Sequence, residues 1–125
     1  DNAKEDILLE DLELQSFSYD SAYDAATRYL DAIESRPDAI FTWNDTAAMA
    51  FISAYRDAGA TIPDDVSIVG YNDIPAAQYF SPRITTIRQD THQAGRVLAA
   101  KLLRIIEGES PQSALIRTEL IRRDS

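Results

Sequence analysis

Three dipeptides in the sequence pair a side-chain amide with a carboxylate, and each follows a strand-like run. They are Asn44-Asp45, Asn72-Asp73 and Gln89-Asp90. An amide offers a donor and an acceptor to hydroxyls and ring heteroatoms, whereas a carboxylate accepts from two hydroxyls or holds an ammonium group. If the fold brings these side chains together, they form a polar pocket for a small molecule.

The runs that precede the dipeptides indicate where the side chains lie. Ala39 to Trp43, Val66 to Tyr71 and Ile84 to Arg88 are short and apolar or β-branched, which is typical of buried strands covered on both faces. In open α/β sheets, ligands bind beyond the carboxyl ends of the strands. The dipeptides are therefore expected along one rim of a sheet.

Each dipeptide also has a purely structural explanation. Asn and Asp after a strand are ordinary turn and helix N-cap residues, so both explanations stay open for any one dipeptide. Asp45 and Asp90 are expected to act first as caps. Asn44, Asn72 and Gln89 are the predicted ligand contacts, because an amide recurs at the same place in three elements.

Two aromatic residues are candidates for the apolar walls that such pockets need. Phe17 ends an earlier strand predicted over Ile7 to Phe17, and Trp43 ends the strand before the first dipeptide. Trp43 suits the core better than the pocket. Asp45 and Asp73 are possible supporting residues.

Composition and charge exclude several classes of function. The 125 residues are 45% hydrophobic, which predicts one globular unit with a real core. A net charge of −9 repels polyphosphate, so nucleic acid is not a predicted partner of this segment. There is no cysteine, and no apolar run approaches the ~20 residues of a membrane span. We expect a cytoplasmic protein without a cofactor. Because the chain begins without Met, we also expect it to be part of a longer protein.

No constellation in the sequence predicts an enzyme or a metal site. His92 is the only histidine and has no serine in a nucleophile elbow. The four glycines form no phosphate-binding loop. Asp64-Asp65 follows Pro63 in a turn and lacks a spaced third ligand.

Apolar periodicity predicts helices between the strands. They run from Ser21 to before Pro37, from Thr46 to Ala58 with Gly59 as the C′ residue, and from Thr91 to about Glu107 between a capping box at Asp90 and Gly108. A last pair of extended runs covers Ala114 to Arg122. Strands that alternate with helices predict an α/β fold with a doubly wound, mainly parallel sheet.

Several of these segments resemble the effector domain of lactose-repressor-type (LacI family) bacterial transcription regulators. The resemblance covers about Phe17 to Ser125 and rests on Pro37 to Phe41, Asn44-Asp45, Ile62 to Ile74, Ile84 to Gln89 and Glu119 to Ser125. It implies a fold like that of periplasmic sugar-binding proteins, with two lobes around an effector cleft. Residues 1–89 would form the C-terminal lobe, residues 90–118 would cross to the N-terminal lobe, and residues 119–125 would return as a strand.

The resemblance also implies roles for individual residues. The position of Phe17 is an aromatic wall, and Asn44, Asn72 and Gln89 line the cleft and bind the effector. The implied dimer surface includes Met49, Ile52, Tyr79, Phe80 and Pro82. The family commonly has aspartate at the position of Asn72 and a small residue at that of Trp43, so no particular sugar is predicted.

The function that the resemblance implies is binding of a sugar-like or nucleoside-like effector and dimerisation in a transcription regulator. DNA would be held by a helix-turn-helix domain absent from this chain. A periplasmic solute-binding protein for transport is the alternative, and an enzyme of doubly wound architecture is the third hypothesis. The helix from Thr91 would lack its partner lobe, so its apolar stripe is expected to repack or to exchange with a second copy. That stripe consists of Ala94, Leu98, Leu102 and Ile105.

Overall fold

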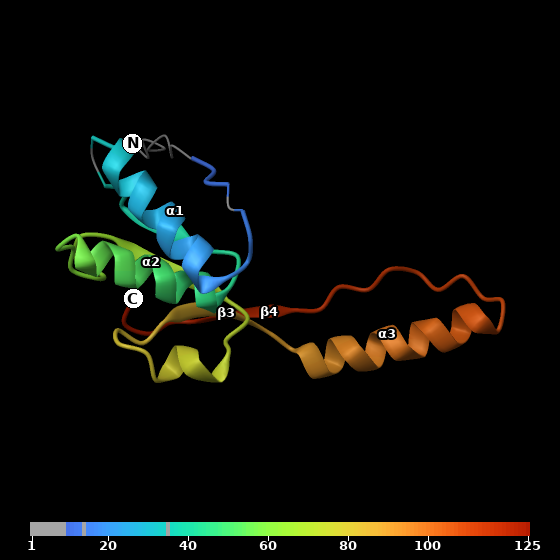
Figure 1. The fold of residues 1–125 in the computed structure, drawn as a ribbon. Coiled ribbons are helices and arrows are strands. Elements are labelled where there is room, and N and C mark those ends of the chain that lie inside the picture. The colour runs from blue at the N-terminus through green and yellow to red at the C-terminus, as the bar shows by residue number, and fades with distance from the viewer. Residues whose placement is uncertain (1–9, 14, 35) are drawn as a thin grey trace, which may run out of the picture.

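The computed structural model describes residues 10–13, 15–34 and 36–125, in which strands and helices alternate (Figure 1). In chain order the elements are α1 (Tyr19–Ala32), β1 (Ala39–Phe41), α2 (Asp45–Asp57), β2 (Ser67–Tyr71), the 3₁₀ helix η1 (Pro75–Gln78), β3 (Thr85–Gln89), α3 (Thr91–Ile106) and β4 (Thr118–Ile121). The α/β prediction is confirmed.

The described strands form one sheet in the order β1-β2-β3-β4. The pairs β1–β2 and β2–β3 are parallel, whereas β4 returns antiparallel to β3, with Thr86 opposite Ile121. The sheet is therefore mainly parallel, as predicted. Because β1, β2 and β3 run in the same direction, their carboxyl ends lie at one edge.

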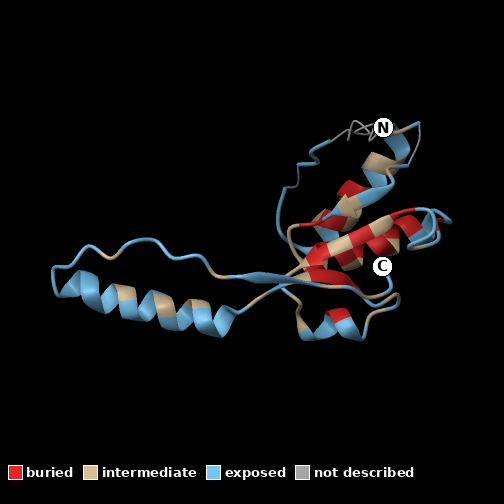
Figure 2. Ribbon diagram, turned by 180° about the vertical axis from the view of Figure 1, so that it is seen from behind, coloured by how far each residue is buried: buried red, intermediate tan, exposed pale blue. Residues whose placement is uncertain are grey.

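The hydrophobic core lies between one face of the sheet and two helices. Helix α2 packs on β2, and α1 packs on α2 (Figure 2). Ile52 and Tyr55 of α2, Ile68 of β2 and Ile84 before β3 are all fully buried. The Ala-rich sequence of α2 predicts a helix covered on more than one side, and its position between α1 and the sheet confirms this.

Strand β1 departs from the sequence prediction of burial on both faces. It is the edge strand of the sheet, and the side chain of Phe41 is 65% exposed. Phe41 makes an edge-to-face contact with Tyr71 of the neighbouring strand, with ring centroids 6.4 Å apart. The large exposure of Phe41 in the described chain means that an apolar strand sequence is left half covered.

The segment before α1 also differs from its prediction. Ile7 to Leu9 and Leu14 lie outside the described residues, and residues 10–13 and 15–17 do not form a strand. These residues have no hydrogen-bonded neighbour strand in the described chain, and alternation of apolar side chains alone does not make a strand. Ser18 caps α1 by accepting a hydrogen bond from Ser21 N, and the helix ends at Ala32 because Ile33 is extended.

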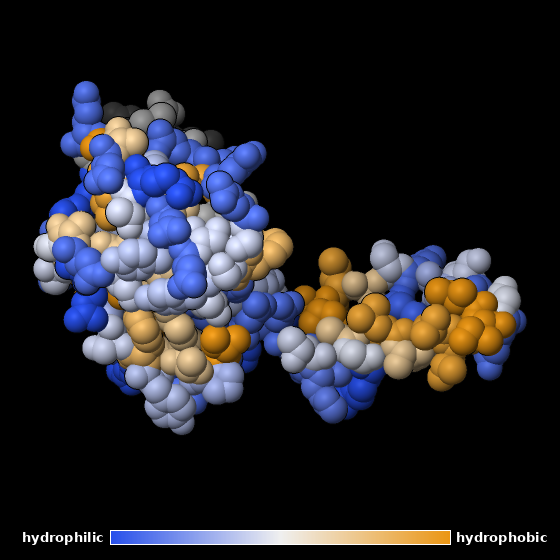
Figure 3. All heavy atoms as spheres, viewed as in Figure 1, coloured by the Kyte–Doolittle hydropathy of each residue, from blue (hydrophilic) through white to orange (hydrophobic). Residues whose placement is uncertain are grey.

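Helix α3 extends away from the rest of the described chain (Figures 1 and 3), and none of its residues is buried. Its ends are as predicted: Asp90 caps the helix by accepting from Gln93 N at 2.7 Å, and Gly108 has a φ of +86°. Leu98 and Leu102 are 67% and 58% exposed. The stripe is not repacked within the structure, and exchange with a second copy stays a prediction.

Tyr55 places an unpaired polar group in the core. Its side chain is fully buried, and its hydroxyl has no hydrogen-bond partner among the described residues. Tyr55→Phe is therefore expected to leave the free energy of unfolding unchanged or to raise it by up to about 1 kcal/mol, measured by urea unfolding at neutral pH. A loss of stability well beyond the error of that measurement would contradict the assignment of an unpaired hydroxyl.

The buried Tyr55 hydroxyl also predicts how the stability of the fold changes at alkaline pH. Burial raises the pKa of Tyr55 from its usual 10.0 to about 12. Because the folded pKa lies above the unfolded one, this contribution to stability is complete below pH 10 and is lost as the pH rises towards 12. Unfolding measured between these pH values should show a smaller loss of stability in Tyr55→Phe than in the parent.

Candidate ligand-binding site

Two of the three predicted amides meet at the carboxyl edge of the parallel strands. Gln89, at the end of β3, donates from Nε2 to Oδ1 of Asn72, just beyond β2, at 2.7 Å. The contact leaves Asn72 Nδ2 as a donor and Gln89 Oε1 as an acceptor, with no partner among the described residues. Asn72 is exposed and Gln89 is half-buried, so the pair faces outward and can contact a ligand.

Asn44 combines capping with a free donor. It is the N-cap of α2, and its Oδ1 accepts from Ala47 N at 2.7 Å. Its Nδ2 has no acceptor among the described residues. The prediction that Asp45 is the cap is therefore wrong by one position, because the helix begins at Asp45 and its first turn binds the preceding side chain.

Asp45 lies beneath the edge and has no exposed surface. Its Oδ2 accepts from Ile74 N at 2.7 Å, and its Oδ1 accepts from the Thr86 hydroxyl at 2.5 Å. A side chain buried in this way supports the edge from inside and does not touch a ligand. This burial was not predicted from the sequence. Gly70 within β2 is the signal that could have indicated it, because a glycine in a strand often marks the close approach of another group.

Asp73 is held by two arginines. Arg123 Nη2 donates to its Oδ1 at 2.7 Å, and Arg88 Nε donates to its Oδ2 at 2.7 Å. Burial alone would raise the pKa of the Asp73 carboxyl, but the hydrogen bonds from Arg123 and Arg88 outweigh burial and hold this pKa below its usual value. The carboxylate is thus already neutralised by protein groups.

The two aromatic candidates lie against each other. Phe17 is 78% exposed and meets Trp43 edge to face, with ring centroids 6.0 Å apart. Trp43 packs against the core, as expected from the sequence, and its Nε1 is buried without a partner among the described residues. Phe17 is therefore the member of the pair whose ring surface is open to a ligand.

Comparison with known proteins identifies the family of this chain. Residues 5–125 match the family described as periplasmic binding protein-like domain. The chain belongs to this family. A structure of the transcriptional regulator CelR in complex with cellobiose is similar with a TM-score of 0.79 and 33% identity, over 88% of this chain and 34% of that one.

The relatives of this periplasmic binding protein-like domain are LacI-type regulators. The HTH-type transcriptional repressor PurR of Photobacterium profundum is 39% identical over 111 residues, which cover 87% of this chain and 33% of the relative. The lac repressor dimer bound to operator and the anti-inducer ONPF has a TM-score of 0.79 and 26% identity, over 87% and 38% of the two chains. The domain described here thus spans about a third of the length of the curated relatives it matches.

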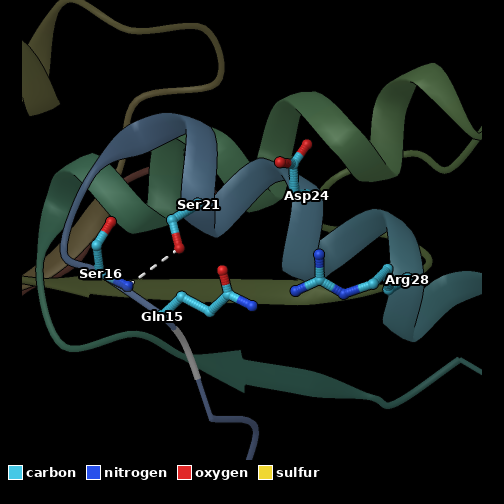
Figure 4. A pocket seen from close by; sticks show the side chains of 5 residues that line it. All are labelled: Gln15, Ser16, Ser21, Asp24 and Arg28. Carbon is cyan, nitrogen blue, oxygen red and sulfur yellow. Dashed lines mark hydrogen bonds between the residues drawn. The ribbon is translucent and has the colours of Figure 1, made fainter.

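An open hollow of this periplasmic binding protein-like domain lies beside the start of α1 (Figure 4). It is lined by the polar side chains of Gln15, Ser16, Ser21, Asp24 and Arg28. A second hollow, lined by Arg56, Ala60, Thr61, Ile62, Ser81 and Pro82, lies near the end of α2. Neither hollow includes Asn44, Asn72 or Gln89, so the predicted ligand contacts do not line these two hollows.

The residues predicted for a dimer surface differ in exposure. Tyr79 is 81% exposed, while Met49, Phe80 and Pro82 are half-buried. Ile52 has no exposed surface because it packs in the core, so it presents no surface to a partner. Within the described residues, no group of three or more metal-ligating side chains occurs, and no helix is long and apolar enough to span a membrane.

Proposed function

We propose that this chain is the effector-binding and dimerisation part of a LacI-type transcription repressor, in which the effector controls operator binding allosterically. The observation that carries the proposal is the contact between Asn72 and Gln89 at the carboxyl edge of the parallel strands. This edge is where open α/β folds bind small ligands. The similarity to repressors supports the same function.

The chemistry of the edge favours a neutral, hydroxyl-rich effector such as a sugar or a nucleoside. Asn72 and Gln89 present one donor and one acceptor side by side, which suits a pair of hydroxyls or the edge of a heterocycle. The neighbouring charges are not free, since Asp73 is paired with two arginines and Asp45 is buried. The exposed ring of Phe17 supplies an apolar wall.

The proposed partners follow from the family. The protein acts in the cytoplasm as a homodimer, with Met49, Tyr79, Phe80 and Pro82 at the interface. It holds DNA through a helix-turn-helix domain outside this chain, contacts no membrane, carries no cofactor and catalyses no reaction. Coupling between effector and operator in such systems is typically ~1–3 kcal/mol.

A periplasmic solute-binding protein is the alternative, because transport proteins share this fold. The similarity to repressors favours the regulator. The residues upstream of Asp1 in the intact protein separate the two functions: a helix-turn-helix supports regulation, and a secretory signal supports transport.

Effector binding should depend on the three amides. In the intact protein, Gln89→Ala is expected to weaken the binding of its effector by about tenfold, because one hydrogen bond is lost at the site. Asn44→Asp keeps the oxygen that caps α2 and replaces the free NH₂ donor by a carboxylate oxygen, so it tests the ligand contact without loss of the cap. Calorimetry with cellobiose, glucose, sucrose, adenosine and guanosine measures the affinities.

Gln78→Ala is the matched control, since Gln78 is an exposed glutamine in η1 whose side chain makes no hydrogen bond to the amide pair. It should leave both affinity and sedimentation unchanged. Equal affinity of the parent, Gln89→Ala and Asn44→Asp would mean that these amides serve only the fold. Failure of every compound in the panel to bind the unaltered protein would count against the proposed function itself.

A further inference from the structure

We propose that Asp45 is a positioning residue, which holds the turn at Asn72-Asp73 so that the carboxamides of Asn72 and Gln89 stay paired at the edge of the sheet. The proposal rests on the proposed function, because the pair matters only if it contacts the effector. Asp45 is buried and cannot touch a ligand, so it would affect ligand binding only through the residues that it holds in place.

The carboxylate of Asp45 joins three elements. Its Oδ2 accepts from Ile74 N at 2.7 Å, and its Oδ1 accepts from Thr86 Oγ1 at 2.5 Å. Asp45 itself lies in the first turn of α2, Thr86 is the second residue of β3, and Ile74 follows the turn after β2. Both oxygens of one side chain are thus used to tie the turn to the helix and to the neighbouring strand.

The turn needs such support because its backbone is unfavourable. Asn72 has a φ of +102° and Asp73 a φ of +52°, the region that side chains with a Cβ disfavour. The turn is held on its first side by the hydrogen bond from Asn72 N to Ile87 O at 2.8 Å. On its second side, the bond from Ile74 N to Asp45 holds it. Loss of the second bond would let the turn relax and move the Asn72 carboxamide away from Gln89.

The burial of a charge here also points to a specific task. No lysine, arginine or histidine of the described chain forms an ion pair with Asp45, and a buried carboxylate without a cation is unfavourable unless hydrogen bonds satisfy it. The N-terminus of α2 offers partial compensation through the helix dipole. Packing alone would be served better by an apolar side chain.

Gly70 supplies the space that the carboxylate occupies. A Cβ at this position would overlap Asp45 Oδ1, although a glycine weakens the middle of a strand. Gly70 is therefore an unfavourable residue for a buried strand, and Asp45 is an unfavourable residue for the buried side of a helix. Both residues serve the contacts to Thr86 and Ile74.

The test compares Asp45→Ala, Asp45→Asn and Thr86→Val in the full-length protein. Two signals are followed, namely hydrogen exchange at the Ile74 amide and the side-chain NH₂ resonances of Asn72 and Gln89. Asp45→Ala should speed exchange at Ile74 by about tenfold or more, because one hydrogen bond is lost, and should shift both NH₂ signals. Thr86→Val should give a smaller change of the same kind.

Asp45→Asn should largely rescue both signals. Its Oδ1 can accept from Ile74 N while its Nδ2 donates to a reversed Thr86 hydroxyl, so both contacts survive without the charge. Val66→Ala is the matched core control, because Val66 is 1% exposed and directly precedes β2, at the end of the strand opposite the turn. It should lower global stability without moving the NH₂ signals.

Unchanged exchange at Ile74 and unchanged NH₂ signals in Asp45→Ala would overturn the proposal, as would equal shifts in Val66→Ala. If Asp45→Ala does not fold, the comparison of Thr86→Val with Val66→Ala decides by the same signals. Where a compound of the calorimetric panel binds the parent, Asp45→Ala should lose affinity and Asp45→Asn should retain it. If none binds, the proposed function fails, but the amide signals still test whether Asp45 positions the turn. Failure of the proposed function and failure of the positioning role are therefore distinguishable.

Discussion

Gly70→Ala is expected to lower the free energy of unfolding by about 3 kcal/mol, at the upper end of the usual effect of overpacking. The added methyl group would overlap Asp45 Oδ1 and come within 3.2 Å of Asp45 Cα. The side chain cannot swing aside, because Ile74 N and the Thr86 hydroxyl hold its two oxygens. The substitution therefore forces either a shift of α2 against the sheet or the loss of two buried hydrogen bonds. Urea unfolding of the parent and the variant measures the difference.

Gly95→Ala is the matched control for this prediction. Gly95 lies within α3, and a Cβ there would meet no atom within 4 Å. The same chemical change should be neutral or stabilising by up to about 1 kcal/mol, because alanine favours a helix over glycine. In an Asp45→Ala background the effect of Gly70→Ala should shrink, since the overlapping oxygen is gone. A Gly70→Ala variant as stable as the parent would refute the close approach.

Arg123→Leu is expected to lower the free energy of unfolding by about 3 kcal/mol, because it removes one partner of a buried ion pair. The side chains of Arg123 and Asp73 are only 13% and 9% exposed. Arg123 also donates from Nη1 to Ile84 O at 2.8 Å, so the substitution leaves two buried acceptors without their donor. Arg88 remains beside Asp73 and limits the loss.

The pair also predicts how stability changes with pH. Because Arg123 and Arg88 hold the folded pKa of Asp73 below its usual 3.8, the pair contributes stability above that pH and loses it as the pH falls through the folded pKa. The pKa of an aspartate in the unfolded chain is about 3.9, so the effect of the pair is measured below pH 5. Acid unfolding in this range should show a smaller loss of stability with falling pH in Arg123→Leu than in the parent. Equal acid dependence of the two proteins would contradict this account.

Arg83→Leu is the control for Arg123→Leu, because it removes an arginine from an exposed ion pair instead of a buried one. Arg83 pairs with Asp124 at 2.6 Å, but their side chains are 60% and 47% exposed. Solvent screens such a pair, so its loss should change stability far less than the loss of Arg123. A similar loss in both variants would mean that the burial of Arg123 makes no difference.

The local features of this fold could be predicted from the sequence because each depends on nearby residues. The left-handed Gly59 and Gly108 end helices with φ values of +83° and +86°, and the Asp90 side chain caps the helix that follows it. The apolar runs before the three dipeptides predict strands β1, β2 and β3, and the helices between them predict a parallel sheet. These signals place Asn44, Asn72 and Gln89 at one edge, and the family resemblance agrees.

The partners of the polar side chains were decided only by the tertiary structure. Asp45 meets Ile74 and Thr86, which lie 29 and 41 residues away, and Asp73 meets Arg123 across 50 residues. Periodicity within a short window carries no information on such contacts. The exposure of Phe41 likewise depends on which elements reach the sheet, and not on its own sequence.

The sequence by itself thus determined that amides follow the strands, since strand ends and helix caps are local. Only the tertiary structure decided that one carboxylate supports the edge from below, that another is neutralised by arginines, and that two amides touch. The physical reason is that hydrogen bonds between distant segments form only after the sheet has set their distance.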